Sequence, residues 1–222
     1  MTPEIQTESI VNMGTAFTQN GGKGFYVLNI IGQIEGHFIS TPQTKTTKYE
    51  HVLPLLASLE QSEEINGVLI LLNTIGGDVE AGLAIAEMIA GLSKPTVSLV
   101  LGGSHSIGVP LAVSADFTFI VPSATMTLHP VRTSGLVVGA PQSFEYFNKM
   151  QTRIVNFICE HSKISEQVLR SYIMRTDDIA TDMGTVIDGY EAVKIGLADK
   201  VGTLSEAYVE LKKRVDISKG KM

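Results

Sequence analysis

The chain contains a single cysteine, Cys159, and no tryptophan among its 222 residues. One thiol excludes an internal disulfide and suits a reducing compartment. Cys159 lies in the helical pattern "RIVNFICEH", where a free cysteine is usually a core residue rather than a nucleophile. No apolar run reaches the roughly 18 residues of a membrane span, and the first residues lack the basic and apolar regions of a signal peptide. We therefore expect a cytoplasmic protein without an integral membrane segment.

Charged residues are also scarce. They make up 18% of the chain, the net charge is -6, and hydrophobic residues make up 44%. The acidic balance gives no support to nucleic-acid binding, which needs a basic surface, and the hydrophobic share excludes a largely disordered chain. The length suffices for one sizeable core, and the low charge suggests that further surface is buried between subunits.

Strand and helix patterns alternate after a polar segment over residues 1–24, which we expect to be a flexible N-terminal arm. Short apolar runs predict buried strands at 25–34, 65–74, 96–102, 117–122 and 124–130. Helical spacing predicts helices at 49–62, 78–92, 106–116, 142–163, 165–175 and 190–197. The alternation predicts an α/β domain with a mostly parallel sheet over residues 25–205, followed by a C-terminal helix or tail over 206–222. Asp78 is expected to cap the helix that follows it.

Two of the predicted strands end near glycines and lead directly into a helix. "GVLILLNT" is followed by "IGG", and "TVSLVLGG" is followed by "SHSIG". In parallel sheets, sites form at these carboxyl ends, where free N–H groups at a helix start favour an anion. The phosphate-binding motifs, the P-loop and G-x-G-x-x-G, are missing at these junctions. Their absence favours the oxyanion of an acyl-transfer reaction over a phosphate.

Ser106 stands at the second junction and has two interpretations. Serine is a preferred capping residue, so Ser106 can cap the helix "IGVPLAVSAD". It can also be a nucleophile, because a serine at a strand-to-helix turn presents its hydroxyl beside free N–H groups. "SHSIG" differs from the nucleophile motif G-x-S-x-G only by Ser104 at the first glycine, and Ser104 is expected to shape the turn.

His129 is a better candidate than His105 for a base that activates Ser106. Neighbouring side chains of an extended segment point to opposite faces, so His105 is expected to be a wall or interface residue. His129 closes a predicted strand before Pro130, which favours extended geometry, and it can lean over the same sheet edge as Ser106. Its alternative role is that of an ordinary polar residue at a strand end. Structural roles are expected for His37, His51 and His161, and without a metal-binding spacing we expect neither metal nor cofactor.

Four segments in chain order carry a resemblance to the Clp peptidase family of serine peptidases. "LNTIGGDVEAGLAIAEMI" resembles its Asn-Ser-Pro-Gly-Gly segment before an amphipathic helix, and "GGSHSIGVPLAVSAD" resembles its Ala-Ser-Met-Gly nucleophile stretch. "ATMTLHP" resembles Met-Ile-His-Gln-Pro, and "YEAVKIGLADKVG" resembles a Glu-Ala-x-x-x-Gly-Leu-x-Asp close. The similarity spans residues 25–204 and is specific to the Clp/crotonase-like superfamily. The departures resemble the translocation-enhancing, Clp-peptidase-like proteins of spore-forming bacteria.

The resemblance implies a ClpP/crotonase-like fold of repeated β-β-α units and a serine endopeptidase acting on peptides or unfolded polypeptides, with a link to protein export. It makes Ser106 the nucleophile and His129 the general base. Gly76, or the pair Gly76–Gly77, and the N–H of Ile107 become the oxyanion donors.

The resemblance also implies an acid that orients the histidine, at a short fixed distance before the Glu-Ala-x-x-x-Gly-Leu close. Counted without gaps, this position is Gly184, which has no carboxylate. A two-residue insertion in "DMGTVIDG" makes Asp182 the candidate. Asp177 and Asp178 are alternatives, although they can also be an exposed acidic pair beside Arg175.

A protruding strand–helix handle near residues 131–165 is implied as well. In the family, this handle joins two heptameric rings into a chamber, and the substrate lies beside the strand as an added β-strand. The resemblance therefore places substrate binding at Gly135, Leu136 and Val137, in a segment that can also be a plain surface hairpin. The implied partners are copies of this chain in a heptamer or stacked double ring, a peptide or unfolded protein, and an ATPase or the secretion machinery.

Three other functions stay open at this point. A Ser–Lys enzyme resembling signal-peptide peptidases would require Lys94, Lys149 or Lys163 near the serine. An acyl-CoA enzyme of the crotonase type would share the oxyanion site without a Ser–His pair. A non-catalytic ring that binds extended chains would require neither a Ser–Lys nor a Ser–His pair. This function stays open because a fold alone does not determine a function.

Overall fold

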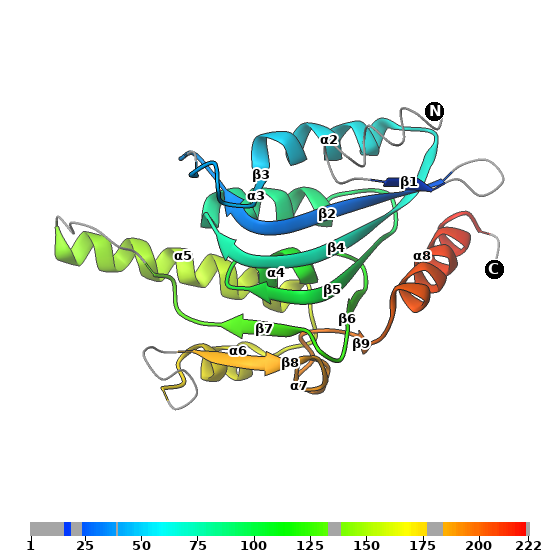
Figure 1. Cartoon of the computed structure of the whole chain (residues 1–222). Helices are drawn as coiled ribbons and strands as arrows, with labels where there is room; N and C mark the ends of the chain where they lie inside the picture. The colour runs from blue at the N-terminus through cyan, green and yellow to red at the C-terminus, as the bar shows by residue number, and fades with distance from the viewer. Residues whose placement is uncertain (1–15, 19–23, 39, 133–138, 177–183, 221–222) are drawn as a thin grey trace.

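A mixed sheet runs through the computed structural model of the chain (Figure 1). The structure describes residues 16–18, 24–38, 40–132, 139–176 and 184–220. The strands in these ranges are β1 (Ala16–Thr18), β2 (Gly24–Glu35), β3 (Thr46–Lys48), β4 (Ile65–Gly77), β5 (Thr96–His105), β6 (Thr118–Ile120), β7 (Thr125–Leu128), β8 (Thr185–Asp188) and β9 (Lys200–Val201). The helices are α2 (Tyr49–Gln61), α3 (Val79–Ala90), α4 (Gly108–Val113), α5 (Ala140–Glu160), α6 (Glu166–Ile173), α7 (Gly189–Lys194) and α8 (Leu204–Ser218).

The strands pair in the order β1-β2-β4-β5-β6-β9, with β3 beside β2 and β7 between β5 and β8. The pairs are parallel except for β1–β2 and β7–β8. β5 pairs with β6 along Ser98–Val100 and with β7 along Gly103–His105. The carboxyl ends of β4, β5 and β7 therefore meet at one edge, and the predicted α/β fold with a mostly parallel sheet is confirmed.

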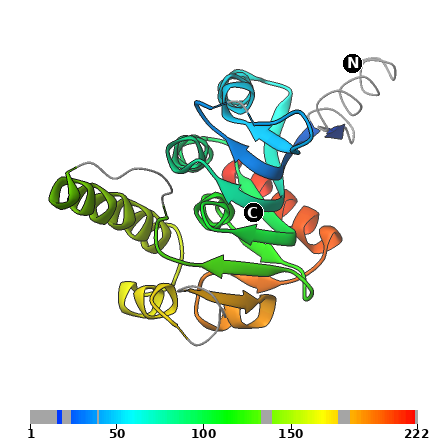
Figure 2. The same ribbon diagram turned by 60° about the vertical axis from the view of Figure 1, so that its left-hand side comes forward.

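Successive residues of the central strands supply two separate apolar clusters, because side chains alternate across a strand. Ile70 and Val100 belong to the larger cluster, which includes residues of α2, α3 and α4. Leu69 and Leu99 belong to a second cluster with Leu211 of α8. Figures 1 and 2 show α2, α3 and α4 on one face of the sheet and α8 on the other, while α5 extends away from the sheet.

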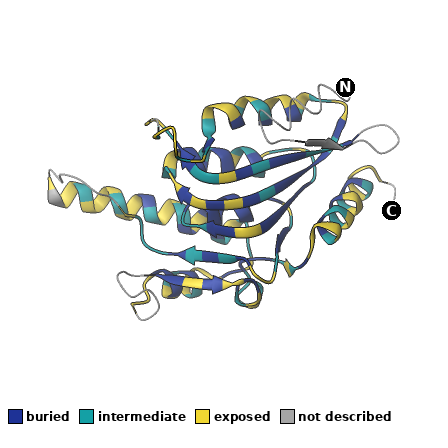
Figure 3. Cartoon of the chain, in the orientation of Figure 1, coloured by how far each residue is buried: buried dark blue, intermediate teal, exposed yellow. Residues whose placement is uncertain are grey.

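Next to α8, the same face carries exposed apolar side chains toward the carboxyl ends of the strands. Ile31 on β2, Ile75 on β4 and Leu101 on β5 are 49%, 67% and 42% exposed, and Figure 3 shows exposed positions along these strands. No helix of the described ranges covers this part of the sheet. We refer to Ile31, Ile75 and Leu101 as the open sheet face.

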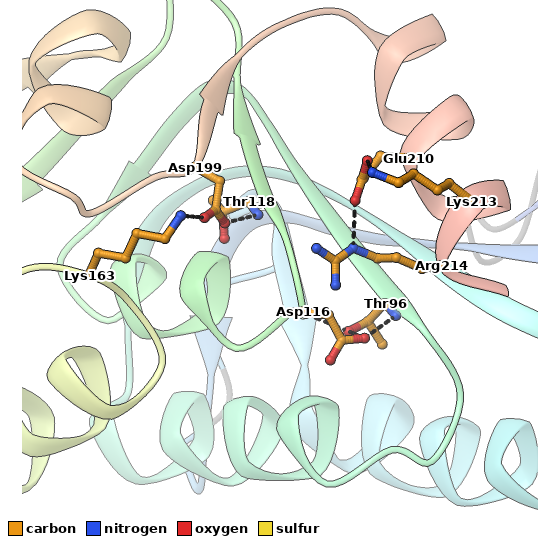
Figure 4. A network of polar contacts seen from close by, with 8 residues as sticks. All are labelled: Thr96, Asp116, Thr118, Lys163, Asp199, Glu210, Lys213 and Arg214. Atoms are coloured by element: carbon orange, nitrogen blue, oxygen red, sulfur yellow. Dashed lines mark hydrogen bonds and ion pairs between the residues drawn. The ribbon is translucent and has the colours of Figure 1, made fainter. Parts of the chain in front are cut away.

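At the opposite, amino edge of the sheet, where the parallel strands begin, two carboxylates accept hydrogen bonds from backbone N–H groups. Asp116 accepts from the N–H of Thr96 at the start of β5 (2.8 Å), and Asp116 N donates to Thr96 Oγ1 in return (2.9 Å). Asp199 accepts from the N–H of Thr118 at the start of β6 (2.9 Å) and pairs with Lys163 (2.6 Å). Figure 4 shows both contacts. These bonds satisfy N–H groups that the neighbouring strands leave unpaired.

The predicted strands and helices correspond to β2, β4, β5, β6, β7 and to α2 through α7, with shifts of a few residues at their ends. Asp78 caps α3 as predicted, because its Oδ1 accepts from Ala81 N at 2.8 Å. The sequence analysis did not identify β1, β3, β8 or β9, and β1 lies within the segment 1–24 that it predicted to be an arm. β8 has four residues in which buried and exposed positions alternate, which is too short a pattern to stand out in the sequence.

Candidate active site

Ser106 and His129 line one cavity of about 170 Å³ at the carboxyl edge of the sheet. Ser106 follows the last residue of β5, and His129 follows the last residue of β7. Gly77 and Ile107 line the same cavity. Its other apolar walls come from α3, α4, β7, α5 and α6 and include Val79, Val109, Leu128, Ile154, Ile158 and Ile173.

The backbone at Ser106 has a left-handed conformation, with φ of 58°. An L-residue other than glycine adopts this conformation at a cost of roughly 1–2 kcal/mol, and such strain concentrates at functional sites. The turn is held by Ser106 N donating to Thr127 O (3.0 Å) and by Val109 N donating to Ser106 O (3.0 Å). The capping interpretation of Ser106 is wrong, because the N-cap of α4 is Ile107 and no side chain caps this helix.

Gly76 makes room for this turn. Its φ is 86°, and a Cβ at this position would lie 2.7 Å from both Ser106 Cβ and His105 O. The N–H of Gly76 donates to Thr74 Oγ1 at 3.1 Å. Gly76 therefore makes room for the turn at Ser106 through its missing side chain, and its N–H is already bonded to Thr74.

Ser104 shapes the other side of the turn. Its side chain is fully buried, and Oγ donates to Gly108 O in the first residue of α4 (2.6 Å). A Cβ on Gly108 would approach Thr74 Cγ2 to 2.7 Å and Ser104 Oγ to 3.0 Å, so helix and strands pack here without space for a side chain. This geometry agrees with the role expected for Ser104.

His129 has its Nδ1 atom 2.7 Å from the carbonyl oxygen of Pro130. A carbonyl oxygen can only accept a hydrogen bond, so Nδ1 carries the hydrogen. In the neutral ring, Nε2 then keeps a lone pair. The local backbone thus selects the tautomer that a general base requires.

His105 makes a different contact. Its Nδ1 lies 2.7 Å from Thr127 Oγ1 on the neighbouring strand. Burial lowers the pKa of His105, and the nearby charge of His129 lowers it further. The ring extends over Gly103, where a Cβ would come within 2.3 Å of His105 Nε2. His105 therefore packs beside the turn against Gly103 and Thr127, and it is not among the residues that line the cavity of Ser106 and His129.

Gly184 lies beside His129 and is bonded to the residues that follow α6. Its N–H donates to Arg175 O at 2.7 Å, which brings positions 175 and 184 together. Gly184 has φ of 132°, and a Cβ there would lie 2.5 Å from Leu128 O and 2.8 Å from His129 Cβ. The position counted without gaps therefore has no space for an acidic side chain. The three candidate acids, Asp177, Asp178 and Asp182, lie outside the described residues, as do Gly135, Leu136 and Val137.

The lysines required by a Ser–Lys mechanism have other surroundings. Lys94 Nζ donates to Ser62 O (2.7 Å) and Ile65 O (3.1 Å), at the amino edge of the sheet. Lys163 pairs with Asp199, and Lys149 lies exposed on α5. None of the three lines the cavity of Ser106.

Two residues near the cavity were not singled out from the sequence. Thr127 binds both the N–H of Ser106 and the ring of His105. Gln151 Oε1 accepts from Val131 N at 2.8 Å and so ties α5 to the segment after His129. The sequence offered one indication of Thr127, namely that the two threonines of "TMTL" alternate with apolar residues along the strand.

The described residues contain no cluster of three or more His, Cys, Asp or Glu side chains suited to a metal ion. Within the same ranges, no helix has both the length and the apolar character needed to cross a membrane.

Comparisons with known proteins agree with this architecture. The sequence model described as Clp protease matches residues 23–205. Translocation-enhancing protein TepA of Halalkalibacterium halodurans is 53% identical over 191 residues, which cover 86% of this chain and 75% of that protein. ATP-dependent Clp protease proteolytic subunit 1 of Chlamydia muridarum is 25% identical over 170 residues, covering 74% of this chain and 84% of that protein.

Among solved structures, a ClpP1 mutant from Listeria monocytogenes has a TM-score of 0.63 and 21% identity, and the match covers 82% of this chain and 93% of that one. This likeness confirms the ClpP-type fold expected from the four motifs. With the match over residues 23–205 and the 53% identical relative, the chain belongs to the Clp protease family.

Proposed function

We propose that the chain is a serine peptidase of the Clp type that cleaves peptides or unfolded polypeptides inside an oligomeric chamber. The observation that supports this most directly is the cavity shared by Ser106 and His129. The strained backbone of Ser106 and the fixed tautomer of His129 add to it, because both are features of a nucleophile and its base.

In the proposed reaction, His129 Nε2 accepts the proton of the Ser106 hydroxyl while the serine oxygen attacks the peptide carbonyl carbon. The imidazolium then gives this proton to the leaving amine, and an acyl-enzyme forms. Water, deprotonated by the same nitrogen, hydrolyses the acyl-enzyme and restores the serine. The acceptor of the Nδ1 hydrogen keeps the ring oriented during both steps; it is the Pro130 carbonyl in the structure, and the acid assigned below would replace it.

The oxyanion would be bound by the N–H groups of Ile107 and Gly77. Ile107 precedes α4, and the first N–H groups of a helix lack partners within the helix. Gly77 lines the cavity, whereas the N–H of Gly76 is bonded to Thr74. Within the glycine pair we therefore assign the donor to Gly77. Loss of one such donor typically lowers the rate by about 10²–10³.

We assign Asp182 as the acid behind His129, with Asp177 and Asp178 as alternatives. The support is the anchoring of the loop ends: Gly184 packs against His129, and its N–H binds Arg175 O. Asp182 precedes Gly184 by two residues, and Asp177 follows Arg175 by two. A carboxylate from either end of this loop would stabilise the imidazolium more strongly than a carbonyl can.

The proposed assembly is a ring of copies of this chain, because members of the family typically form such rings. The open sheet face offers apolar surface for a subunit contact. An extended substrate would pair with Gly135, Leu136 and Val137. The name of the 53% identical relative, a translocation-enhancing protein, favours a role in protein export. Its partner would then be the secretion machinery or an ATPase.

The test uses a serine-reactive fluorophosphonate and a short fluorogenic peptide. Ser106→Ala and His129→Gln should abolish labelling and hydrolysis, whereas Ser114→Ala should keep both because Ser114 does not line the cavity. Labelling of Ser106→Ala at the wild-type rate would exclude the assignment. An assembled wild-type ring that binds peptide but is never labelled would instead support a non-catalytic scaffold.

The acid is identified by comparing three amide variants. Loss of the orienting carboxylate lowered kcat by roughly 10⁴ in a Ser-His-Asp peptidase. We therefore expect Asp182→Asn to lose most of its turnover while Asp177→Asn and Asp178→Asn retain it. Equal turnover in all three variants would leave the Pro130 carbonyl as the group that orients His129.

A further inference from the structure

We propose that His105 and Thr127 form a positioning pair that fixes the strand of the nucleophile to the strand of the histidine. The inference extends the proposed peptidase activity by two residues whose side chains take no part in the proposed bond-making and proton-transfer steps. It rests on the contact between their side chains and on the place of Thr127 between Ser106 and His129.

Thr127 is bonded on two sides. Its carbonyl oxygen accepts from Ser106 N (3.0 Å), which holds the left-handed turn. Its hydroxyl lies 2.7 Å from His105 Nδ1. His105 and Thr127 are direct partners in the parallel pairing of β5 and β7. His129 follows Thr127 by two residues, so one residue links the backbone of the nucleophile with the strand that carries the base.

The sequence around the pair agrees with a specific contact between the two side chains. In the motifs quoted above, His105 stands at the alanine of Ala-Ser-Met-Gly, and Thr127 stands at the methionine of Met-Ile-His-Gln-Pro. These two departures from the family motifs touch each other. Gly103 supplies the space for the ring, because any side chain there would overlap His105 Nε2.

The pair also has an electrostatic consequence. His129 is the titratable group whose charge acts on His105, and the residues opposite Thr127 on either side are His105 and the uncharged Val186. Burial and this charge both favour neutral His105. A neutral ring can keep its contact with Thr127 while His129 becomes an imidazolium during the reaction.

The first test compares Thr127→Val, which keeps the shape but removes the hydroxyl, with Thr127→Ser, which keeps the hydroxyl. One lost hydrogen bond corresponds to about a threefold to tenfold loss. We expect that loss in kcat for Thr127→Val with KM unchanged, and near-normal turnover for Thr127→Ser. His105→Leu should match Thr127→Val, and the double variant should be no slower than either single variant. Normal turnover in Thr127→Val, or additive losses in the double variant, would refute the pair.

The second test does not depend on hydrolysis, so it separates failure of the pair from failure of the proposed peptidase. The five histidines are labelled with ¹³C and titrated by NMR in the assembled protein. We expect Thr127→Val to shift the titration of both His105 and His129, and Thr127→Ser to shift neither. We also expect His129→Gln to raise the apparent pKa of His105. Unchanged midpoints in Thr127→Val would overturn the inference even if the enzyme is active.

Discussion

Replacing Ser106 by glycine is expected to stabilise the chain, although it removes the proposed nucleophile. Ser106 has φ of 58°, which costs an L-residue about 1–2 kcal/mol and costs glycine nothing comparable. Glycine adds about 0.4–1 kcal/mol of conformational freedom to the unfolded chain. Because Ser106→Ala keeps the strain and loses the same hydroxyl, we expect the glycine variant to be more stable than the alanine variant by about 0.5–1 kcal/mol.

Ser114 provides the matched control. It ends α4 with φ of -69°, in the ordinary right-handed region, and its Oγ donates to Leu111 O at 2.9 Å. Both substitutions lose this bond, so only the backbone effect separates them. Here we expect alanine to be more stable than glycine by about 0.5–1 kcal/mol, which reverses the order found at Ser106.

The assay is urea unfolding of the four variants at equal protein concentration, so that assembly contributes equally to each. In thermal unfolding, a difference of 1 kcal/mol corresponds to about 2–4 °C for a chain of this size. If alanine is the more stable substitution at both positions, the turn at Ser106 is not strained. The link between strain and nucleophile would then be refuted.

Two further predictions concern stability. Leu211 is fully buried between α8 and the sheet, so Leu211→Ala should cost about 2–5 kcal/mol in urea unfolding, whereas Val209→Ala, exposed on the same helix, should change stability by less than about 0.5 kcal/mol. The Lys200 ammonium and Thr203 lower the pKa of Glu206 from 4.5 to about 2. Because the folded pKa lies below the unfolded one, the stabilisation by this carboxylate is complete above about pH 4.5 and is lost as pH falls toward about 2. Glu206→Gln should therefore flatten the pH dependence of unfolding in that interval, and an unchanged slope would contradict the contribution of Glu206.

The sequence was most informative where an element has a long and simple pattern. The apolar runs of β2, β4 and β5 and the spacing in α3 predicted the sheet and the location of its carboxyl edge. Because parallel strands end at one edge, this also brought Ser106 and His129 into the same neighbourhood. The preference of serine for capping positions misled one interpretation, since a cap and a left-handed turn use the same residue type at the same junction.

Other features depend on contacts that no local pattern contains. The contact of His105 with Thr127 requires the register of β5 and β7, which lie on opposite sides of α4 and β6 in the sequence. The packing of α8 on Leu69 and Leu99 joins the last helix with the middle of the chain. The lack of space at Gly184 follows from its approach to His129, whereas the sequence showed only a missing carboxylate.

The carboxylate contacts at the amino edge have a mechanical consequence for the opposite edge. β5 runs from Thr96, whose N–H is bonded to Asp116, to His105, which directly precedes the proposed nucleophile Ser106. Ten strand residues form a lever of about 30 Å, so a tilt of about 1° at the base would displace the tip by about 0.5 Å. In the proposed reaction the Ser106 hydroxyl has to come within hydrogen-bond distance of His129, and this geometry tolerates little such movement. The aiming of Ser106 thus depends on a bond at the far end of its strand as well as on the residues around it.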